Sequence, residues 1–182
     1  MQRGEWRRDM TSNGTGRSVF IFGGPGGGAL AAMSLAALAD AGEQVHVAGF
    51  LNDQLAPGTT VCGSPVHGPF ESWISVPDDA LFIAPLHSVS SMHERRARIE
   101  GLGVPDDRWI TVVDPRAFVA PDVVVGRGCL VGPGACLSPG VRLADHVAVR
   151  HGGHVGHDTV VGTMSFIGAN SVLCGWCRVG DE

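Results

Sequence analysis

Residues 117–182 divide without remainder into eleven hexapeptides: AFVAPD, VVVGRG, CLVGPG, ACLSPG, VRLADH, VAVRHG, GHVGHD, TVVGTM, SFIGAN, SVLCGW and CRVGDE. The third place of each holds a branched aliphatic residue, from Val119 to Val179, with no slip in register. The first place is nearly always small or β-branched, and the last three places are rich in Gly, Pro, Asp, Asn and Ser. A repeat this regular predicts a stacked architecture.

A left-handed parallel β-helix accounts for this period. Each hexapeptide would form a short strand and a turn, and three would make one triangular coil of 18 residues. The third-place aliphatics then stack inside the coil beside the small first-place residues, and they bury a core only because coils stack on one another. Turn residues such as Gly126, Gly132, Gly162, Gly168 and Asn170 are expected to adopt the unusual backbone angles of the corners.

An α/β pattern precedes the hexapeptides. Short apolar runs predict strands over 18–22, 44–50, 81–85 and 109–113, and the stretches 29–41 and 90–102 predict helices. Strands that alternate with helices favour a small parallel sheet. We therefore expect a disordered tail over 1–17, a Rossmann-like acceptor-binding domain over 18–115 and a β-helix domain over 116–182.

Composition and charge exclude several classes of function. The 182 residues carry a formal charge of −5, which gives no electrostatic footprint for nucleic acid. No run approaches the roughly 18 apolar residues that span a bilayer, and the polar N-terminus lacks the apolar core of a secretion signal. The five cysteines are an odd number and are expected to be reduced thiols, as in a cytoplasmic protein. Neither a nucleic acid nor a membrane is an expected partner.

Four of the eight histidines cluster between the fifth and seventh hexapeptides, at 146, 151, 154 and 157. The hexapeptide GHVGHD holds His154, His157 and Asp158 together. Imidazole is well suited to act as a general base near neutral pH, and an adjacent carboxylate can orient it. Two alternatives stay open. These histidines are ordinary solvent-exposed turn residues, or they bind a metal between subunits, as in hexapeptide proteins that resemble carbonic anhydrases.

A glycine-rich loop, 23–28, lies between the first expected strand and the first expected helix. Backbone N–H groups at the start of a helix can hold phosphate or another anion, and residues 24–29 match the G-x-G-x-x-A form. Close packing of the helix on the strand explains the glycines equally well. Asn52 and Asp53 follow the second expected strand, where ribose or base contacts are often made, although both are also common turn formers.

The combination of IFGGPGGG (21–28), GFLND (49–53), a charged helix and VGHD (155–158) resembles the family of sialic acid O-acetyltransferases and bacillosamine-type sugar N-acetyltransferases. The resemblance covers residues 18–182. It implies an acetyl-CoA-dependent N- or O-acetyltransferase that acts on a sugar, a nucleotide sugar or a similar small acceptor. It also implies a homotrimer whose active sites lie between neighbouring subunits, with no metal.

The resemblance assigns roles to individual residues. His157 would deprotonate the acceptor, Asp158 would orient His157, and the backbone N–H of Gly175 would hold the thioester carbonyl of acetyl-CoA. Gly175 follows His157 by 18 residues, so stacking of successive coils also predicts that the two lie side by side. The residues expected to contact the acceptor are Gly23, Gly24, Pro25, Gly26, Asn52, Asp53, Arg150 and His154.

Four positions depart from the family pattern. Gly27 stands where the family has His, Gly156 replaces an acidic residue, Arg150 replaces Asn, and Phe166 replaces a second His. An acceptor other than a nucleotide sugar therefore stays open, with His154 or Arg150 supplying polar contacts. A catalytically inactive binding or scaffolding homologue is a further alternative.

Overall fold

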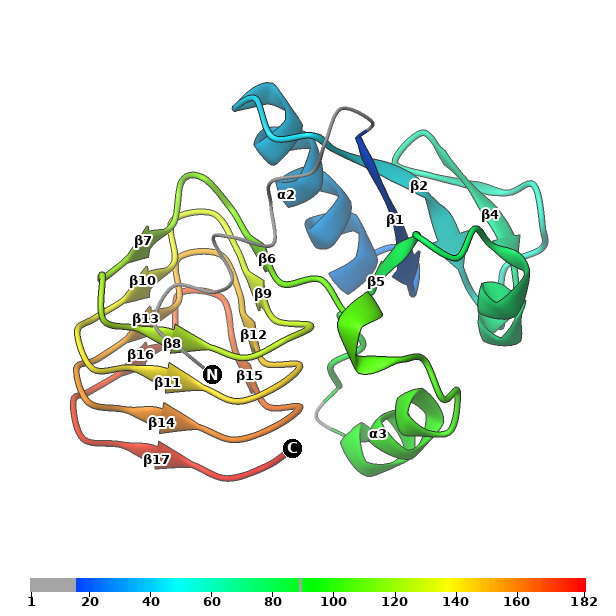
Figure 1. Ribbon diagram of the computed structural model, residues 1–182. Coiled ribbons are helices and arrows are strands. Elements are labelled where there is room, and N and C mark those ends of the chain that lie inside the picture. The colour runs from blue at the N-terminus through cyan, green and yellow to red at the C-terminus, as the bar shows by residue number, and fades with distance from the viewer. Residues whose placement is uncertain (1–15, 89) are drawn as a thin grey trace.

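The computed structural model describes residues 16–88 and 90–182, which form a small α/β unit and a β-helix beside it (Figure 1). The sheet of the α/β unit has the order β3-β4-β2-β1-β5. Its strands are β1 (Arg17–Phe22), β2 (Val45–Leu51), β3 (Thr60–Val61), β4 (Ser64–Gly68) and β5 (Leu81–Ile83). The strands pair in parallel except β3 and β4, which form an antiparallel pair.

The predicted tail lies mostly outside the described residues, which begin at residue 16. Arg17 is already the first residue of β1, because its backbone N–H donates to the carbonyl of Gln44 at 2.7 Å. The strand therefore begins one residue earlier than the sequence predicts.

Helix α2 (Gly27–Asp40) is the layer between the sheet and the β-helix. Its buried residues Ala31 and Leu35 share one apolar core with Ile21 of β1 and with Leu130 and Ala148 of the β-helix. The opposite face of the sheet has a second core, rich in aromatic side chains, under the 3-10 helix η1 (Phe70–Ser75) and helix α3 (Met92–Glu100). A short 3-10 turn, η2 (Asp106–Arg108), leads from α3 towards the β-helix.

The β-helix consists, in the described chain, of twelve two-residue strands in three four-stranded parallel sheets. The strands are β6 (Val112–Val113), β7 (Phe118–Val119), β8 (Val124–Val125), β9 (Leu130–Val131), β10 (Cys136–Leu137), β11 (Arg142–Leu143), β12 (Ala148–Val149), β13 (His154–Val155), β14 (Val160–Val161), β15 (Phe166–Ile167), β16 (Val172–Leu173) and β17 (Arg178–Val179). We name the sheets by position: the inner sheet (β6, β9, β12, β15) faces α2, and the second (β7, β10, β13, β16) and third (β8, β11, β14, β17) sheets follow along the chain. This arrangement fits the predicted left-handed β-helix.

The sequence predicts one strand of the α/β sheet over residues 109–113, and this prediction is wrong. Trp109 makes only an isolated bridge to Phe82, whereas Val112 and Val113 pair with β9. The β-helix thus contains a twelfth hexapeptide, TVVDPR (111–116), in which Val113 occupies the buried third place. The predicted boundary between 115 and 116 falls inside it.

The prediction that the fourth-place glycines adopt the unusual corner angles is also wrong. The positive φ angles lie at the sixth place, from Gly128 through Asn170 (φ 55°) to Trp176 (φ 61°). The fourth-place glycines Gly126, Gly132 and Gly162 serve another purpose, because a Cβ there would meet the neighbouring coil. A Cβ at Gly126 would lie 2.6 Å from the Ala144 carbonyl carbon, closer than carbon atoms can approach without a shift.

Two polar contacts tie the α/β unit to the β-helix beside the apolar core. The carboxylate of buried Asp114 accepts hydrogen bonds from Ser34 of α2 (2.9 Å) and from the Arg116 guanidinium (2.8 Å). Burial alone would raise the pKa of Asp114, but these donors hold that pKa below its ordinary value. On the other side of the interface, the His87 Nε2 donates to the carbonyl of His146 at 3.0 Å.

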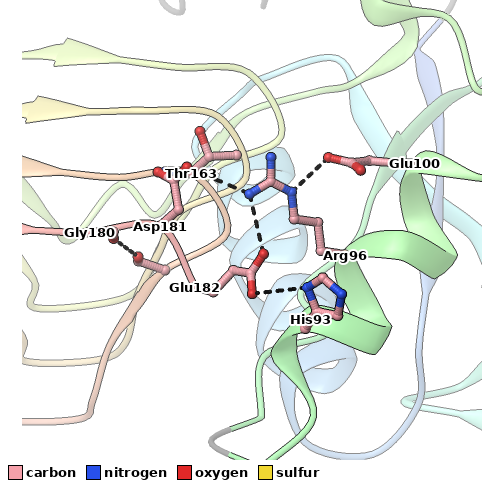
Figure 2. A network of polar contacts seen from close by, with 8 residues as sticks. His93, Arg96, Glu100, Thr163, Gly180, Asp181 and Glu182 are labelled. Atoms are coloured by element: carbon pink, nitrogen blue, oxygen red, sulfur yellow. Dashed lines mark hydrogen bonds and ion pairs between the residues drawn. The ribbon is translucent and has the colours of Figure 1, made fainter.

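A third link joins α3 to the last coil of the β-helix (Figure 2). The guanidinium of Arg96 donates to Glu100 at 2.8 Å within α3 and to Glu182 at 3.3 Å, and its nearest Asp181 oxygen lies at 3.6 Å. Asp181 in turn accepts the backbone N–H of Thr163 at 2.8 Å. Helix α3 is thereby held against the β-helix from one side while its other side faces the sheet.

The stacked core predicts a large cost for truncating an inward side chain. Leu137 is fully buried at the third place of its hexapeptide, in contact with the coils on either side. We expect Leu137→Ala to lower the free energy of unfolding by about 2–5 kcal/mol, measured by urea denaturation. Ile74→Ala serves as the control, because Ile74 is 73% exposed and its truncation should change stability by less than about 0.5 kcal/mol. Equal losses in both variants would contradict the inward stacking.

The contact between His87 and His146 predicts acid sensitivity. Burial lowers the pKa of His87 from 6.5 to about 4, so the folded protein resists protonation that the unfolded chain accepts. Stability from this group is present above pH 6.5 and is lost as the pH falls towards 4, by up to about 3 kcal/mol. In His87→Gln, the amide can still donate to His146 but does not titrate. Urea denaturation at pH 7, 5.5 and 4 should therefore show a shallower pH dependence for His87→Gln, and identical slopes would refute the assignment.

Candidate active site

His157 lies on the turn between β13 and β14, at the corner where the second and third sheets meet. Its Nδ1 and the Oδ2 of Asp158 are 3.0 Å apart, and both side chains are largely open to solvent. Asp158 occupies the sixth place with φ 57°, and its carboxylate faces the preceding imidazole. In the neutral tautomer that donates its Nδ1–H to this carboxylate, the Nε2 atom carries no proton and can act as a base.

Gly175 lies one coil further on, against the imidazole of His157, as the 18-residue period predicts. A Cβ on Gly175 would collide with the Nε2 of His157, so only glycine permits this approach. Trp176 completes the contact by donating its backbone N–H to the His157 carbonyl at 2.9 Å. Within residues 16–88 and 90–182, the Gly175 N–H itself donates to no protein acceptor. An unpaired N–H beside a basic nitrogen can donate a hydrogen bond to a ligand oxygen and so stabilise negative charge that develops on it.

Gly156 makes room for this arrangement. A Cβ at position 156 would lie 2.5 Å from the Gly175 nitrogen and 2.6 Å from the Cys174 carbonyl carbon. The acidic residue that the resemblance implies here therefore does not fit this backbone.

Trp176 is a neighbour of His157 that the sequence analysis misses. Its indole is 75% exposed and meets the His157 ring edge to face, with centroids 6.0 Å apart. The position of Trp176 in the repeat could have identified it. The sixth place has a left-handed conformation, which glycine adopts more readily than a bulky residue does.

A cavity of about 760 Å³ opens in front of the glycine loop, between the α/β unit and the β-helix. Its lining includes the whole loop 23–28, Asn52, Asp53 and Arg150, together with Arg95 and Arg98 of α3. Seven of the eight residues expected to contact an acceptor thus line one cavity: Gly23, Gly24, Pro25, Gly26, Asn52, Asp53 and Arg150.

Asn52 and Asp53 also build the wall that they line. The Asn52 Oδ1 accepts the backbone N–H groups of Gln54 (2.8 Å) and Leu55 (2.9 Å), which is the turn-forming role considered from the sequence. Asp53 accepts the Phe70 N–H at 2.8 Å and the Arg98 guanidinium at 3.0 Å. Of the two side chains, only the Asn52 amide nitrogen, which faces Gly24, keeps donors for a ligand.

The Arg150 guanidinium lies beside Gly27, the position where the family pattern has a His. A Cβ on Gly27 would collide with the carbonyl of Pro85 and lie 3.4 Å from the Arg150 guanidinium, so the His of the family pattern has no room here. Among the described residues Arg150 has no carboxylate partner, and burial lowers its pKa from the ordinary arginine value. The cavity therefore presents an unneutralised cation.

His87, a further lining residue, has no distinguishing motif in the sequence. Its Nδ1 is buried without a hydrogen-bond partner within the described part of the chain. The ring lies against Phe166, with centroids 5.8 Å apart, at the position where the family pattern has a second His.

His154 does not join this cavity. It is the first residue of β13 and holds the second place of its hexapeptide, on the outer surface of the second sheet between Cys136 and Val172, with its Nε2 3.5 Å from the Ser138 hydroxyl. Second-place side chains point out of the coil, and the second sheet does not face α2. The sequence, which places His154 near His157 along the chain, could not separate these two directions.

The cavity and His157 lie on different sides of the β-helix in one chain. The cavity lies beside the inner sheet, whereas the β13–β14 turn lies on the side away from the α/β unit (Figure 1). Among residues 16–88 and 90–182, no group of three or more His, Cys, Asp or Glu side chains is arranged to hold a metal ion. No helix in this part of the chain is long and apolar enough to cross a membrane.

Comparison with solved structures gives the following similarities, while no family model and no curated protein matches the sequence. The acetyltransferase domain of PglB from Neisseria gonorrhoeae is 21% identical, with a TM-score of 0.68 over 91% of this chain and 86% of that one. Its complex with acetyl coenzyme A matches over the same shares, at 21% identity and a TM-score of 0.67. A mutant of perosamine N-acetyltransferase from Caulobacter crescentus, in complex with CoA and GDP-perosamine, is 20% identical with a TM-score of 0.54, over 94% of this chain and 92% of that one. The chain shares the fold of these two acetyltransferases.

Proposed function

We propose that this protein is an acyl-CoA-dependent N- or O-acetyltransferase that acts on a sugar, a nucleotide sugar or a similar small acceptor. The observation that carries the proposal is the contact of His157, Asp158 and Gly175, which unites a base, its orienting carboxylate and an unpaired backbone N–H. The two structural neighbours add support, since one was solved with acetyl coenzyme A and the other with CoA and GDP-perosamine.

The chemistry follows from the positions of these groups. Nε2 of His157 takes the proton from the acceptor amine or hydroxyl as that atom attacks the thioester carbonyl carbon of acetyl-CoA. The carbonyl oxygen becomes an oxyanion beside the N–H of Gly175, and Asp158 stabilises the imidazolium. The C–S bond then breaks, and the CoA thiolate leaves with the proton from His157. The products are the acetylated acceptor and free CoA.

The cavity beside the glycine loop is the proposed acceptor site. We assign the acceptor contacts to the loop 23–26, to the Asn52 amide and to Arg150, with Asp53 supporting the wall. We also propose that the α/β unit is Rossmann-like, because the glycine loop lies at the carboxyl end of β1, where sheets of that kind bind ligands. His154 lies outside this cavity in its own chain, so the acceptor contact expected for it would have to cross a subunit boundary.

A homotrimer would complete the active site. The outer surface of the second sheet carries Phe118, Cys136, His154 and Val172, a column without a permanent charge in which Phe118 is 60% exposed. This column adjoins the corner that holds His157, so a neighbouring subunit packed here would bring its cavity towards that corner. The free thiols of all five cysteines agree with the cytoplasmic location that we propose.

The general-base role predicts a specific loss of activity. Turnover is followed as release of free CoA from acetyl-CoA, with a panel of nucleotide sugars, amino sugars and neutral sugars that includes GDP-perosamine. His157→Ala should lower kcat about 10²- to 10⁴-fold. His151→Ala is the matched control, because His151 is also exposed and holds the same place in the preceding hexapeptide. A His157→Ala enzyme as fast as the control would remove His157 from the mechanism. If acetyl-CoA neither binds nor turns over, the protein is an inactive homologue.

The shared active site predicts complementation between subunits. His157→Ala disables the base, and Arg150→Glu places a negative charge in the acceptor cavity. Mixed trimers of the two variants, purified through two different tags, should regain part of the wild-type rate, because some sites pair an intact His157 with an intact cavity. If every site formed within one chain, mixing would restore nothing, and the same result would follow if the protein were active as a monomer.

A further inference from the structure

The turn after β16 is built around a side chain from the preceding coil. The hydroxyl of Thr159, which is fully buried, donates to the carbonyl of Cys174 at 3.0 Å and accepts the N–H of Cys177 at 3.2 Å. Thr159 directly follows His157 and Asp158, so the same turn that holds the base also reaches the backbone of the next coil.

Two other corners of the β-helix close without a side chain. In the turn that starts at Gly168, the N–H of Ser171 donates directly to the Gly168 carbonyl at 3.2 Å, and the N–H of Gly153 bonds the Arg150 carbonyl in the same way at 3.0 Å. In the turn 174–177 the Thr159 hydroxyl stands between the corresponding carbonyl and N–H. The Cys174 carbonyl is therefore directed towards the interior of the coil.

The direction of that carbonyl determines the direction of the Gly175 N–H, because both belong to the same peptide group. The peptide bonds of the described chain are trans, and in a trans peptide the C=O and N–H point in opposite directions. A carbonyl held inward by Thr159 leaves the N–H of Gly175 facing outward, on the side where His157 lies. The hydrogen bond to the carbonyl also polarises the peptide, which makes its N–H a stronger donor.

We propose that Thr159 is a positioning residue for acyl transfer, whose hydroxyl fixes the Cys174–Gly175 peptide so that the Gly175 N–H faces the thioester carbonyl oxygen. This inference rests on the proposed function of His157 and Gly175. Thr159 does not touch either substrate. It acts through the peptide that stabilises the oxyanion, and its effect therefore falls on the transition state.

The chain contains an internal control for this motif. Thr111 occupies the same place eight hexapeptides earlier, where its hydroxyl donates to the Gly126 carbonyl at 2.6 Å and accepts the Cys129 N–H at 3.3 Å. Thr111 is also buried, but it lies at the first coil and far from His157 in the stack. Substitution of either threonine removes two hydrogen bonds of the same kind. The two variants should therefore have a similar structural cost and differ in their relation to the active site.

The kinetic test compares Thr159→Val, Thr159→Ser and Thr111→Val in the full-length protein with acetyl-CoA. Thr159→Val should lower kcat about tenfold or more while the KM for acetyl-CoA stays within about twofold, and Thr159→Ser should restore most of the rate. Thr111→Val should lose a similar amount of thermal stability and keep its kcat. If Thr159→Val fails to fold, Thr159→Ala carries the same expectation. A kcat for Thr159→Val within twofold of that for Thr111→Val overturns the proposal.

A second readout does not depend on turnover. In ¹⁵N-labelled protein, the amide resonance of Gly175 should shift or broaden in Thr159→Val and stay unchanged in Thr111→Val. An unchanged Gly175 resonance in Thr159→Val overturns the proposal. The His157→Ala variant separates the proposed function from the proposed role of Thr159. Wild-type activity of His157→Ala overturns both. Loss of activity in His157→Ala together with a normal Thr159→Val enzyme overturns only the role of Thr159.

Discussion

The stacking of third-place aliphatic side chains inside the β-helix is the constraint on which the rest of the molecule depends. A single two-residue strand can bury its inward side chain only against the same place in the coils above and below, so register must hold along the whole stack. Once it holds, residues 18 apart become neighbours, as Cys136, His154 and Val172 do. Helix α2 then packs on the inner sheet through Leu130 and Ala148, so the α/β unit takes its position from the same stack.

The same register lets polar groups enter an apolar interior. A buried hydroxyl without a partner is strongly unfavourable, yet Thr111, Thr159 and Ser165 are all tolerated at the first place, since each finds a carbonyl 15 residues ahead. The coil therefore supplies fixed partners at fixed spacings. At Thr159 this regularity bears on the proposed chemistry. The Thr159 hydroxyl bonds the carbonyl of the Cys174–Gly175 peptide, and Gly175 is the residue that the period places against His157.

The sequence predicts most of what periodicity controls and little of what depends on distant contacts. The eleven hexapeptides predict the β-helix and the approach of Gly175 to His157. The hexapeptide TVVDPR escapes notice because its first residues continue an apolar run that resembles a strand of the preceding sheet. Gly126, Gly132 and Gly162 look like turn formers, whereas the structure needs them for the close approach of adjacent coils. His87 has no sequence signal at all, because its partner His146 is 59 residues away.

The triangular cross-section also bears on how a complete active site could form. The corner that holds His157 joins the second and third sheets, so it lies opposite the inner sheet that α2 covers. The cavity containing Arg150 lies beside the inner sheet, and moving it to the opposite corner within one chain would require the apolar core between α2 and Leu130 to separate. That core is fully buried, so such a movement is unfavourable. In the trimer that we propose, a second subunit packed on the uncharged column of the second sheet would bring a cavity near His157 without disturbing any core. The fold that positions the proposed base and the proposed oxyanion donor thus favours our proposal of an acceptor site that comes from another chain.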